Sequence, residues 1–260
     1  MLADGFPEGE SGYELDHASV TICGARPSNQ DVLGDVHQDD LSCFILCDGV
    51  GGHAGGGVAA SLVVETIRDR FVEEAAFGER ALHSYVSHAA QCVRAKQSAE
   101  QALKEMSATV VALLIDRRNR CATWMHVGDT RLYLFRHGEK YAVTKDHSVA
   151  QQFIDAGLCK PDALARHPHR GQLFAAIGAG DGNDLPSPAS ELALLPGDVF
   201  LICTDGVWEN ITDTEMDDSL AQSRNAQEWL ATIKQLCEGS APAGKQPSDN
   251  CSAVAVWVKK

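Results

Sequence analysis

The stretch "CDGVGGHAGGG" (47–57) decides how the centre of this chain folds. It follows the apolar run 41–47 and precedes a segment whose apolar residues recur at helical spacing. Six of its eleven residues are glycine, which costs conformational entropy unless the backbone must pass where side chains would obstruct it. Such a turn could cradle a phosphate, bind a dinucleotide or place the Asp48 carboxylate on a metal ion.

Short apolar runs rich in β-branched residues lie on both sides of this stretch and have the length of strands. We expect strands at 18–24, 41–47, 108–115, 121–127, 131–137, 198–204 and 252–258. The segments 116–120 and 128–130 have the composition of hairpin connections, which predicts antiparallel pairing between the strands that they join.

Helical periodicity appears at 57–74, 79–106, 148–157 and 226–237. Strands separated by paired helices predict an α+β fold, a four-layer α/β/β/α sandwich of two antiparallel sheets flanked by helices. We expect one domain over 1–260, with an N-terminal extension at 1–17 and a flap insertion at about 148–180, where turn-forming residues are frequent.

Composition narrows the class of protein. The net charge of −14 argues against nucleic-acid binding, which needs a basic face. No apolar run is long enough for a membrane span, and the acidic N-terminus lacks the pattern of a signal peptide. The nine scattered cysteines are typical of core residues in a reducing compartment. We therefore expect a cytoplasmic protein that has no membrane or nucleic-acid partner and is a monomer.

Five aspartates stand at or near the ends of the predicted strands: Asp31, Asp48, Asp129, Asp205 and Asp249. If these ends share one edge of the sandwich, the carboxylates converge and repel one another. Mg²⁺ and Mn²⁺ prefer oxygen ligands and would relieve the repulsion. A single Asp-Gly pair is more often a hairpin turn, but neither Asp48-Gly49 nor Asp205-Gly206 is followed by a returning strand.

The residues around Asp48 also fit a dinucleotide-binding site, which is the alternative interpretation to a metal site. The segment 49–54 matches the pattern GxGxxG/A, and Asp69 lies about 20 residues further on. The wider context does not fit, because the first predicted helix runs into a second helix instead of a parallel strand. A dinucleotide-binding oxidoreductase therefore stays only as a minor alternative.

Six motifs in order carry a family resemblance. They are "RPSNQD" (26–31), "CDGVGGHAGG" (47–56), "HVGDTRLYLFR" (126–136), "VTKDHS" (143–148), "LPGDVFLICTDGVWENIT" (195–212) and "DNCSAVAVWV" (249–258). Together they resemble the PPM family of metal-dependent protein phosphatases, also called type 2C serine/threonine phosphatases, most closely the bacterial short form. The resemblance covers residues 18 to 258, nearly the whole chain.

The resemblance implies a set of metal ligands for two Mn²⁺ or Mg²⁺ ions, with room for a third and weaker ion. Asp48 matches the bridging aspartate, and Gly49 matches a carbonyl ligand of one ion. Asp205 and Asp249 match ligands of the other ion, while Asp31 matches a ligand that acts mostly through water. Asp129 matches the acid that holds the third ion together with Asp205.

The resemblance also assigns catalytic and supporting residues. Arg26 matches the arginine that binds the substrate phosphate, and Asn250 matches a residue that supports the Asp249 loop. Eukaryotic members carry a histidine after Asp-Gly as a proposed general acid, but here the position is Val50. His53 is the nearest histidine, and a structural role for it is more plausible, so the general acid stays unassigned.

The function implied by this resemblance is hydrolysis of phosphoserine and phosphothreonine in proteins by metal-activated water. By analogy, the enzyme would act in signalling against a bacterial Ser/Thr kinase, and its phosphorylated protein partners would include that kinase and a forkhead-associated-domain protein. A catalytically silent PPM-like domain that only binds phosphoproteins is the alternative from a different functional class.

Overall fold

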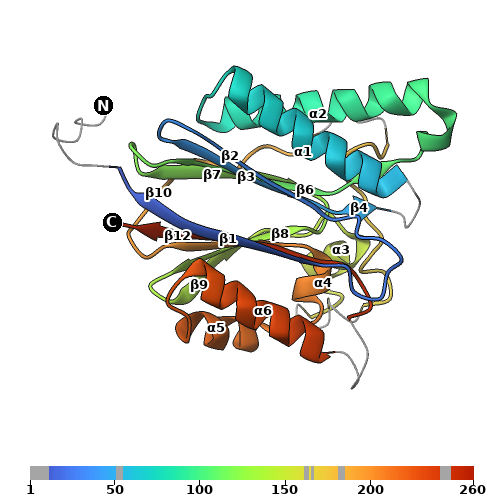
Figure 1. Cartoon of the computed structure of the whole chain (residues 1–260). Coiled ribbons are helices and arrows are strands. Elements are labelled where there is room, and N and C mark those ends of the chain that lie inside the picture. The colour runs from blue at the N-terminus through green and yellow to red at the C-terminus, as the bar shows by residue number, and fades with distance from the viewer. Residues whose placement is uncertain (1–11, 51–54, 161–163, 165–166, 181–184, 241–246) are drawn as a thin grey trace.

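A computed structural model describes residues 12–50, 55–160, 164, 167–180, 185–240 and 247–260. Figure 1 shows two stacked β-sheets, with helices α1 and α2 covering one outer face and α5 and α6 covering the other. The α+β, four-layer α/β/β/α prediction is therefore confirmed.

Each main sheet has five antiparallel strands. Sheet I has the order β1-β12-β11-β8-β9, and sheet II has the order β10-β7-β6-β3-β2. The strands of sheet I are β1 (Glu14–Ile22), β12 (Cys251–Lys259), β11 (Val199–Cys203), β8 (Arg131–Arg136) and β9 (Glu139–Val143). Those of sheet II are β10 (Leu192–Ala193), β7 (Cys121–Val127), β6 (Val110–Asp116), β3 (Leu41–Cys47) and β2 (Val32–Gln38). A short ribbon pairs β4 (Gly49–Val50) with β5 (Ser107–Ala108).

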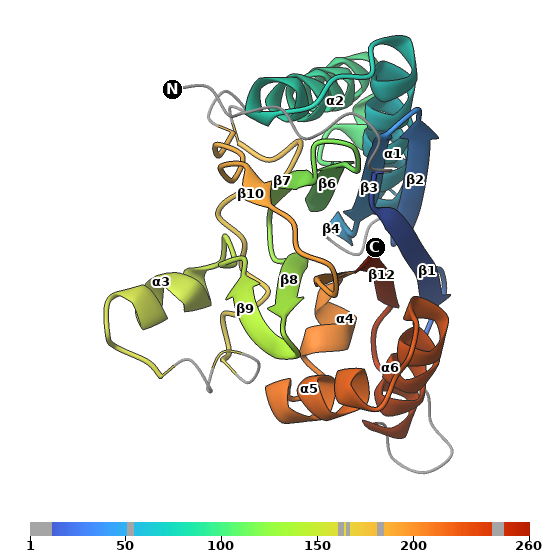
Figure 2. The same ribbon diagram turned by 90° about the vertical axis from the view of Figure 1, so that its left-hand side faces the viewer.

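The helices lie outside the two sheets. They are α1 (Gly55–Glu73), α2 (Glu79–Ala99), the 3₁₀ turn η1 (Gln101–Leu103), α3 (Val149–Asp155), α4 (Asp205–Trp208), α5 (Asp213–Ala221) and α6 (Ala226–Ser240). Figure 2 shows α3 standing away from the sandwich at the side that carries β9. Across the described ranges, no helix is both long and apolar enough to cross a membrane.

Three layers of buried side chains hold the sandwich together. Phe44 and Phe200 lie in the layer between the sheets, and both are fully buried. Phe71 belongs to the layer between sheet II and its helices, and Trp229 belongs to the layer beneath sheet I. Burying one such side chain contributes about 2–3 kcal/mol.

The strand β3 explains why the run before Asp48 is apolar at every position except Ser42. Alternate side chains of a strand face opposite sides of the sheet. Phe44 and Leu46 enter the layer between the sheets, whereas Cys43, Ile45 and Cys47 enter the helix-covered layer. Both faces of β3 are therefore shielded from water, and the strand can end in a charged residue only at the edge of the sandwich.

Several predicted boundaries differ from the structure. The first strand begins at Glu14, so residues 14–17, assigned from sequence to the N-terminal extension, pair with β12. The second helix ends at Ala99 and not at 106. The edge strands β2 and β9 were not predicted, because each faces water along much of its length and carries polar residues.

The prediction that 128–130 forms a hairpin connection is wrong. This segment leads from β7 in sheet II to β8 in sheet I, so it crosses between the two sheets. Gly128 adopts a φ of 105°, a backbone conformation that favours glycine. The crossing places Asp129 between the sheets, where a hairpin would have left it at a solvent-facing turn.

A buried ion pair joins the sheets at the end opposite Asp48. Arg136, at the end of β8, donates two hydrogen bonds of 2.8 and 2.7 Å to the Asp198 carboxylate. It also donates to the carbonyl of Ala193 in β10 of the other sheet, at 2.9 Å. The Asp198 residue is only 1% exposed, so its charge depends on this arginine.

We expect Arg136→Ala to lower the free energy of unfolding by about 3 kcal/mol, because it leaves the Asp198 carboxylate buried without its partner. Urea denaturation followed by circular dichroism measures the change. The matched control Arg118→Ala removes an exposed arginine and should change stability by less than about 0.5 kcal/mol. Equal stability of the two variants would contradict the role given to Arg136.

Candidate metal centre

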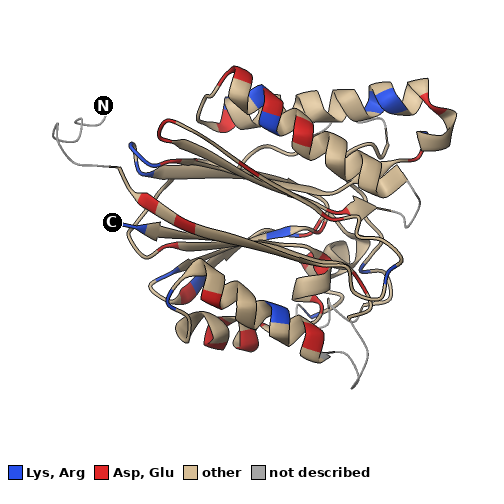
Figure 3. Ribbon diagram, in the orientation of Figure 1, with Lys and Arg blue, Asp and Glu red and all other residues tan. Residues whose placement is uncertain are grey.

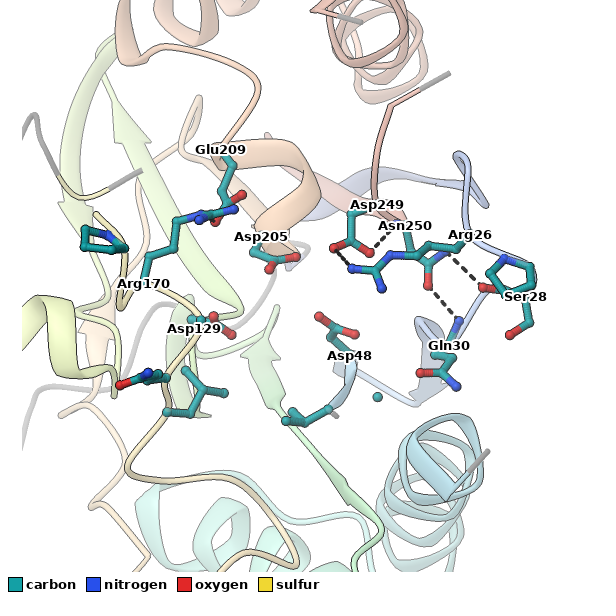
Figure 4. Close-up of a pocket in the computed structure, with 17 residues that line it drawn as sticks. Arg26, Ser28, Gln30, Asp48, Asp129, Arg170, Asp205, Glu209, Asp249 and Asn250 are labelled. Carbon is teal, nitrogen blue, oxygen red and sulfur yellow. Dashed lines mark hydrogen bonds and ion pairs between the residues drawn. The ribbon is translucent and has the colours of Figure 1, made fainter. Parts of the chain in front are cut away.

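A cavity of about 410 Å³ opens where several strands end at one side of the sandwich. Figure 3 shows acidic residues from separate strands meeting at this end. The carboxylates that line the cavity are those of Asp48, Asp129, Asp205 and Asp249, together with Glu209. Figure 4 shows the side chains of Asp48, Asp129 and Asp205 directed toward a common space.

The backbone on both sides of Asp48 is held firmly. Its N–H donates to the Thr109 hydroxyl at 3.0 Å, and its carbonyl accepts from the Thr109 N–H at 2.8 Å. A Cβ on Gly49 would lie 2.4 Å from the backbone carbon of Gly56, so the chain after Asp48 packs directly on the start of α1. Only glycine permits this approach. His53 lies outside the described residues.

Asp31 lies behind the cavity and is 8% exposed. Its Oδ2 accepts a hydrogen bond of 3.0 Å from the Thr204 hydroxyl. Among the described residues, no donor reaches its buried Oδ1. The neighbouring Asp48 carboxyl group can bond to Asp31 only if the two share a proton. A buried carboxylate oxygen without a donor is what a nearby cation, or water bound to one, would satisfy.

Burial and mutual repulsion raise the pKa values of these acids. The pKa values of Asp48 and Asp205 lie well above the ordinary value because of burial first and then the neighbouring carboxylates. Burial and the nearby Asp146 raise the pKa of Asp129 to about 7. Burial likewise raises the pKa of Asp31. The atoms available as metal ligands are all carboxylate oxygens, and the cluster carries an excess of negative charge. Both properties fit Mg²⁺ or Mn²⁺.

Rigid side chains fix the loop that carries Asp129. The Trp208 indole donates to the Asp129 carbonyl at 2.9 Å, and the Arg131 guanidinium stacks 3.6 Å from the centre of that indole ring. Arg131 in turn donates two hydrogen bonds of 2.7 Å to Asp146. The N–H of Gly128, the residue before Asp129, donates to His147 Nδ1. Burial lowers the pKa of His147 to about 4, so the ring is neutral near pH 7 and Nδ1 accepts this hydrogen bond.

Asn250 connects the start of β12 to the loop that carries Arg26. Its Oδ1 accepts from the Gln30 N–H at 2.9 Å, and its Nδ2 donates to the carbonyls of Cys23 and Ser28 at 2.7 and 3.2 Å. Arg26 lies at the cavity and donates to Asp249 Oδ2 (Figure 4). The structure thus brings Arg26, Asp249 and Asn250 together.

Two charged residues of the cavity wall were not predicted from the sequence. Arg170, within the predicted flap, pairs with Glu209 of the segment after α4. Both residues line the cavity with the aspartates. Glu209 lies one helical turn after Asp205, a spacing that could have identified it. Val50 also lines the cavity, so this position supplies no acidic group.

The chain matches known proteins over most of its length. Residues 25–246 match the family model described as "Protein phosphatase 2C". The serine/threonine protein phosphatase PstP of Mycobacterium tuberculosis is 29% identical over 82% of this chain, and the chain spans only 40% of that protein's length. Protein phosphatase PhpP of Streptococcus pneumoniae is 27% identical over 74% of this chain and 78% of its own length.

A solved structure has the same fold. The catalytic domain of the serine/threonine protein phosphatase PstP, in complex with two manganese ions, superposes with a TM-score of 0.79 at 24% sequence identity. The alignment covers 95% of this chain and 99% of the other.

The raised pKa values predict how stability depends on pH in the metal-free protein. The folded state binds more protons than the unfolded state between the ordinary aspartate pKa of about 4 and the raised values. In EDTA, the free energy of unfolding should therefore fall as the pH rises from about 4 to about 7. Urea denaturation at a series of pH values measures this slope.

The variant Asp129→Asn serves as the test within this series. It removes one of the carboxyl groups that titrate, so the slope should become shallower and the variant should be more stable than wild type at pH 7.5, by on the order of 2 kcal/mol. A stability in EDTA that rises through this pH range would contradict the repulsive cluster.

Proposed function

Because the chain belongs to the protein phosphatase 2C family, we propose that it is a Mn²⁺- or Mg²⁺-dependent phosphatase that hydrolyses phosphoserine and phosphothreonine in proteins. The observation that carries the proposal is the convergence of aspartates from separate strands on one cavity with Arg26 at its wall. PstP and PhpP, the relatives above, are named as protein phosphatases. The name of PstP adds serine and threonine as the residues on which that protein acts.

The aspartates and one carbonyl form the proposed metal site. Asp48 would be shared by two ions, with the Gly49 carbonyl on one of them. Asp205 and Asp249 would hold the other, and Asp31 would act mostly through water, as expected of a residue behind the cavity. Asp129 would hold a third, weaker ion with Asp205. When bound, such ions supply a Lewis acid for the phosphoryl group and activate water as its nucleophile.

Arg26 is the proposed phosphate-binding residue. Its guanidinium donates to Asp249 Oδ2, the same carboxylate that a cation would use. If Asp249 held a cation, the Arg26 guanidinium would lose this partner and be available for another anion. A planar, permanently charged fork is suited to two oxygens of a phosphate group. Asn250 keeps the Arg26 loop and Asp249 in register, as a supporting residue.

The chain supplies no side chain in the position of a general acid, since Val50 is aliphatic. We propose that water protonates the departing serine or threonine alkoxide. The segment 148–180 would act as a flap over the cavity, where Arg170 holds it against Glu209. Its exposed residues would contribute to the choice of phosphoprotein.

In the proposed cellular role, the protein acts in the cytoplasm and removes phosphate groups that a bacterial Ser/Thr kinase adds. The substrates would be phosphorylated proteins, including that kinase and a forkhead-associated-domain protein. We propose that the chain acts as a monomer, without nucleic-acid or membrane partners. The net charge of the sequence is negative, which favours phosphoprotein partners that approach through basic surfaces.

The alternatives are not favoured. A silent phosphoprotein-binding domain would have no need of buried, mutually repelling aspartates, yet all five are present. A dinucleotide site needs a parallel strand after the first helix, whereas β3 pairs antiparallel with both β2 and β6. Asp69, which would bind the ribose in such a site, is exposed on α1.

Removal of a proposed ligand should abolish activity. Asp48→Asn and Asp205→Asn should each lower Mn²⁺-dependent hydrolysis of p-nitrophenyl phosphate and of a phosphothreonine peptide by about 1000-fold, because losing a metal ion forfeits several kcal/mol of transition-state stabilisation. EDTA should have the same effect on wild type. Asp69→Asn, an exposed acid, is the matched control and should keep full activity. Wild-type protein without turnover at any Mn²⁺ concentration would overturn the proposal.

Substitution of Arg26 should separate phosphate binding from metal binding. Arg26→Ala should lower kcat/KM for the phosphothreonine peptide by about 10- to 100-fold, because charged hydrogen bonds to the phosphate are lost. The kcat/KM of Arg26→Lys should lie between those of wild type and Arg26→Ala, since one ammonium group cannot replace the two-pronged guanidinium. The Mn²⁺ concentration for half-maximal activity should decrease in Arg26→Ala, because Asp249 loses its competing partner. An increase would contradict the competition.

A further inference from the structure

Three polar side chains point into the space between the sheets, at the side where β1 and β2 form the edges. His17 shares a face of β1 with Leu15, and Asp35 and His37 share a face of β2 with Leu33. Both leucines pack against the core layer between the sheets. Figures 1 and 2 place β1 beside β2 at this side of the sandwich.

The ligand atoms of this cluster are close together. The distance from His37 Nε2 to Asp35 Oδ2 is 3.1 Å, and that from His17 Nε2 to the same oxygen is 4.0 Å. All three atoms lie within 4.8 Å of one another. Two ligands about 2.0–2.1 Å from a tetrahedral zinc ion are separated by roughly 3.4 Å. Small rotations of the side chains would therefore bring the three ligand atoms to such separations.

Neighbouring groups orient the two imidazole rings. His37 Nδ1 lies 2.9 Å from the Ser42 hydroxyl. His37 Nε2–H donates to Asp35 Oδ2 at 3.1 Å. A cation that replaced this proton would face the Nε2 lone pair while Nδ1–H donates to Ser42, the arrangement typical of metal-binding histidines. Both rings also pack edge-on against the buried Phe44 ring, at centroid distances of 5.2 and 5.5 Å. The His37 ring is therefore held on two sides, and the His17 ring packs against Phe44.

We propose that His17, Asp35 and His37 form a second metal site, which binds a borderline divalent ion of the Zn²⁺ class. Two imidazoles and one carboxylate with access to water match the ligand preference of Zn²⁺ and differ from the all-oxygen set around Asp48. The side chains are 37%, 54% and 38% exposed, so an ion can enter from solvent and keep a water ligand.

The second site is separate from the proposed catalytic centre. His37 lies six positions beyond Asp31 along β2, which at about 3.3 Å per residue is roughly 20 Å. The edge strands β1 and β2 belong to different sheets and share no backbone ladder. An ion held by His17 from one and by Asp35 and His37 from the other would join the sheets at this side and stabilise the folded state.

Calorimetric titration with Zn²⁺ tests the site, with excess Mg²⁺ present to occupy the carboxylate cluster. Wild type should bind one Zn²⁺ ion that His17→Gln, His37→Gln and Asp35→Asn each weaken by at least about 100-fold. Ser42→Ala should weaken binding by about 10- to 100-fold, because it removes the group that orients His37. His83→Gln, at an exposed histidine on α2, is the matched control and should bind as wild type does.

Thermal unfolding gives a second readout. Zn²⁺ should raise the melting temperature of wild type and His83→Gln but not that of His17→Gln or His37→Gln, while all four melt alike in its absence. Zinc binding that survives in both variants, for instance at the exposed Cys23, would overturn the proposal, as would no binding to wild type. The outcome is independent of phosphatase activity, because these residues lie outside the catalytic cavity.

Discussion

Repulsion between buried carboxylates is the constraint on which the rest of this structure depends. Four aspartates that line one cavity stand next to the ends of strands from both sheets, namely Asp48 after β3, Asp129 between β7 and β8, Asp205 after β11 and Asp249 before β12. Burial and proximity raise the pKa values of Asp48, Asp129 and Asp205, so this end of the fold is under electrostatic strain without a cation. Divalent ions are the simplest means of relieving that strain, and they also provide the chemistry of phosphoryl transfer.

The surrounding residues keep the carboxylates in place against this repulsion. Thr109 holds the backbone at Asp48, and Trp208 holds the carbonyl of Asp129. Asn250 ties the Arg26 loop to β12. None of these side chains needs to touch substrate. We propose that these contacts prevent the cluster from spreading apart, so that the binding energy of a cation would not be spent on reassembling its ligands.

The fold class and most of the site were predictable, because the decisive signals are local. Apart from Ser42, the run before Asp48 is apolar since both faces of β3 are buried, and the acid at its end marks the edge of the sandwich. The crossing at Gly128 was not predictable from a short Gly-Asp-Thr segment, which resembles a hairpin. The pair of Arg170 and Glu209 joins residues 39 positions apart, and no local pattern reports such a contact.

Proton release on metal binding tests the central claim most directly. Titration of the metal-free protein with Mn²⁺ at pH 7, in two buffers of different ionisation enthalpy, measures the protons displaced. Asp129, whose pKa is about 7, still holds a proton in part of the molecules at this pH, so we predict a release of at least about half a proton that declines as the pH rises further above 7. Binding without proton release, or a release that Asp48→Asn and Asp129→Asn leave unchanged, would contradict the account.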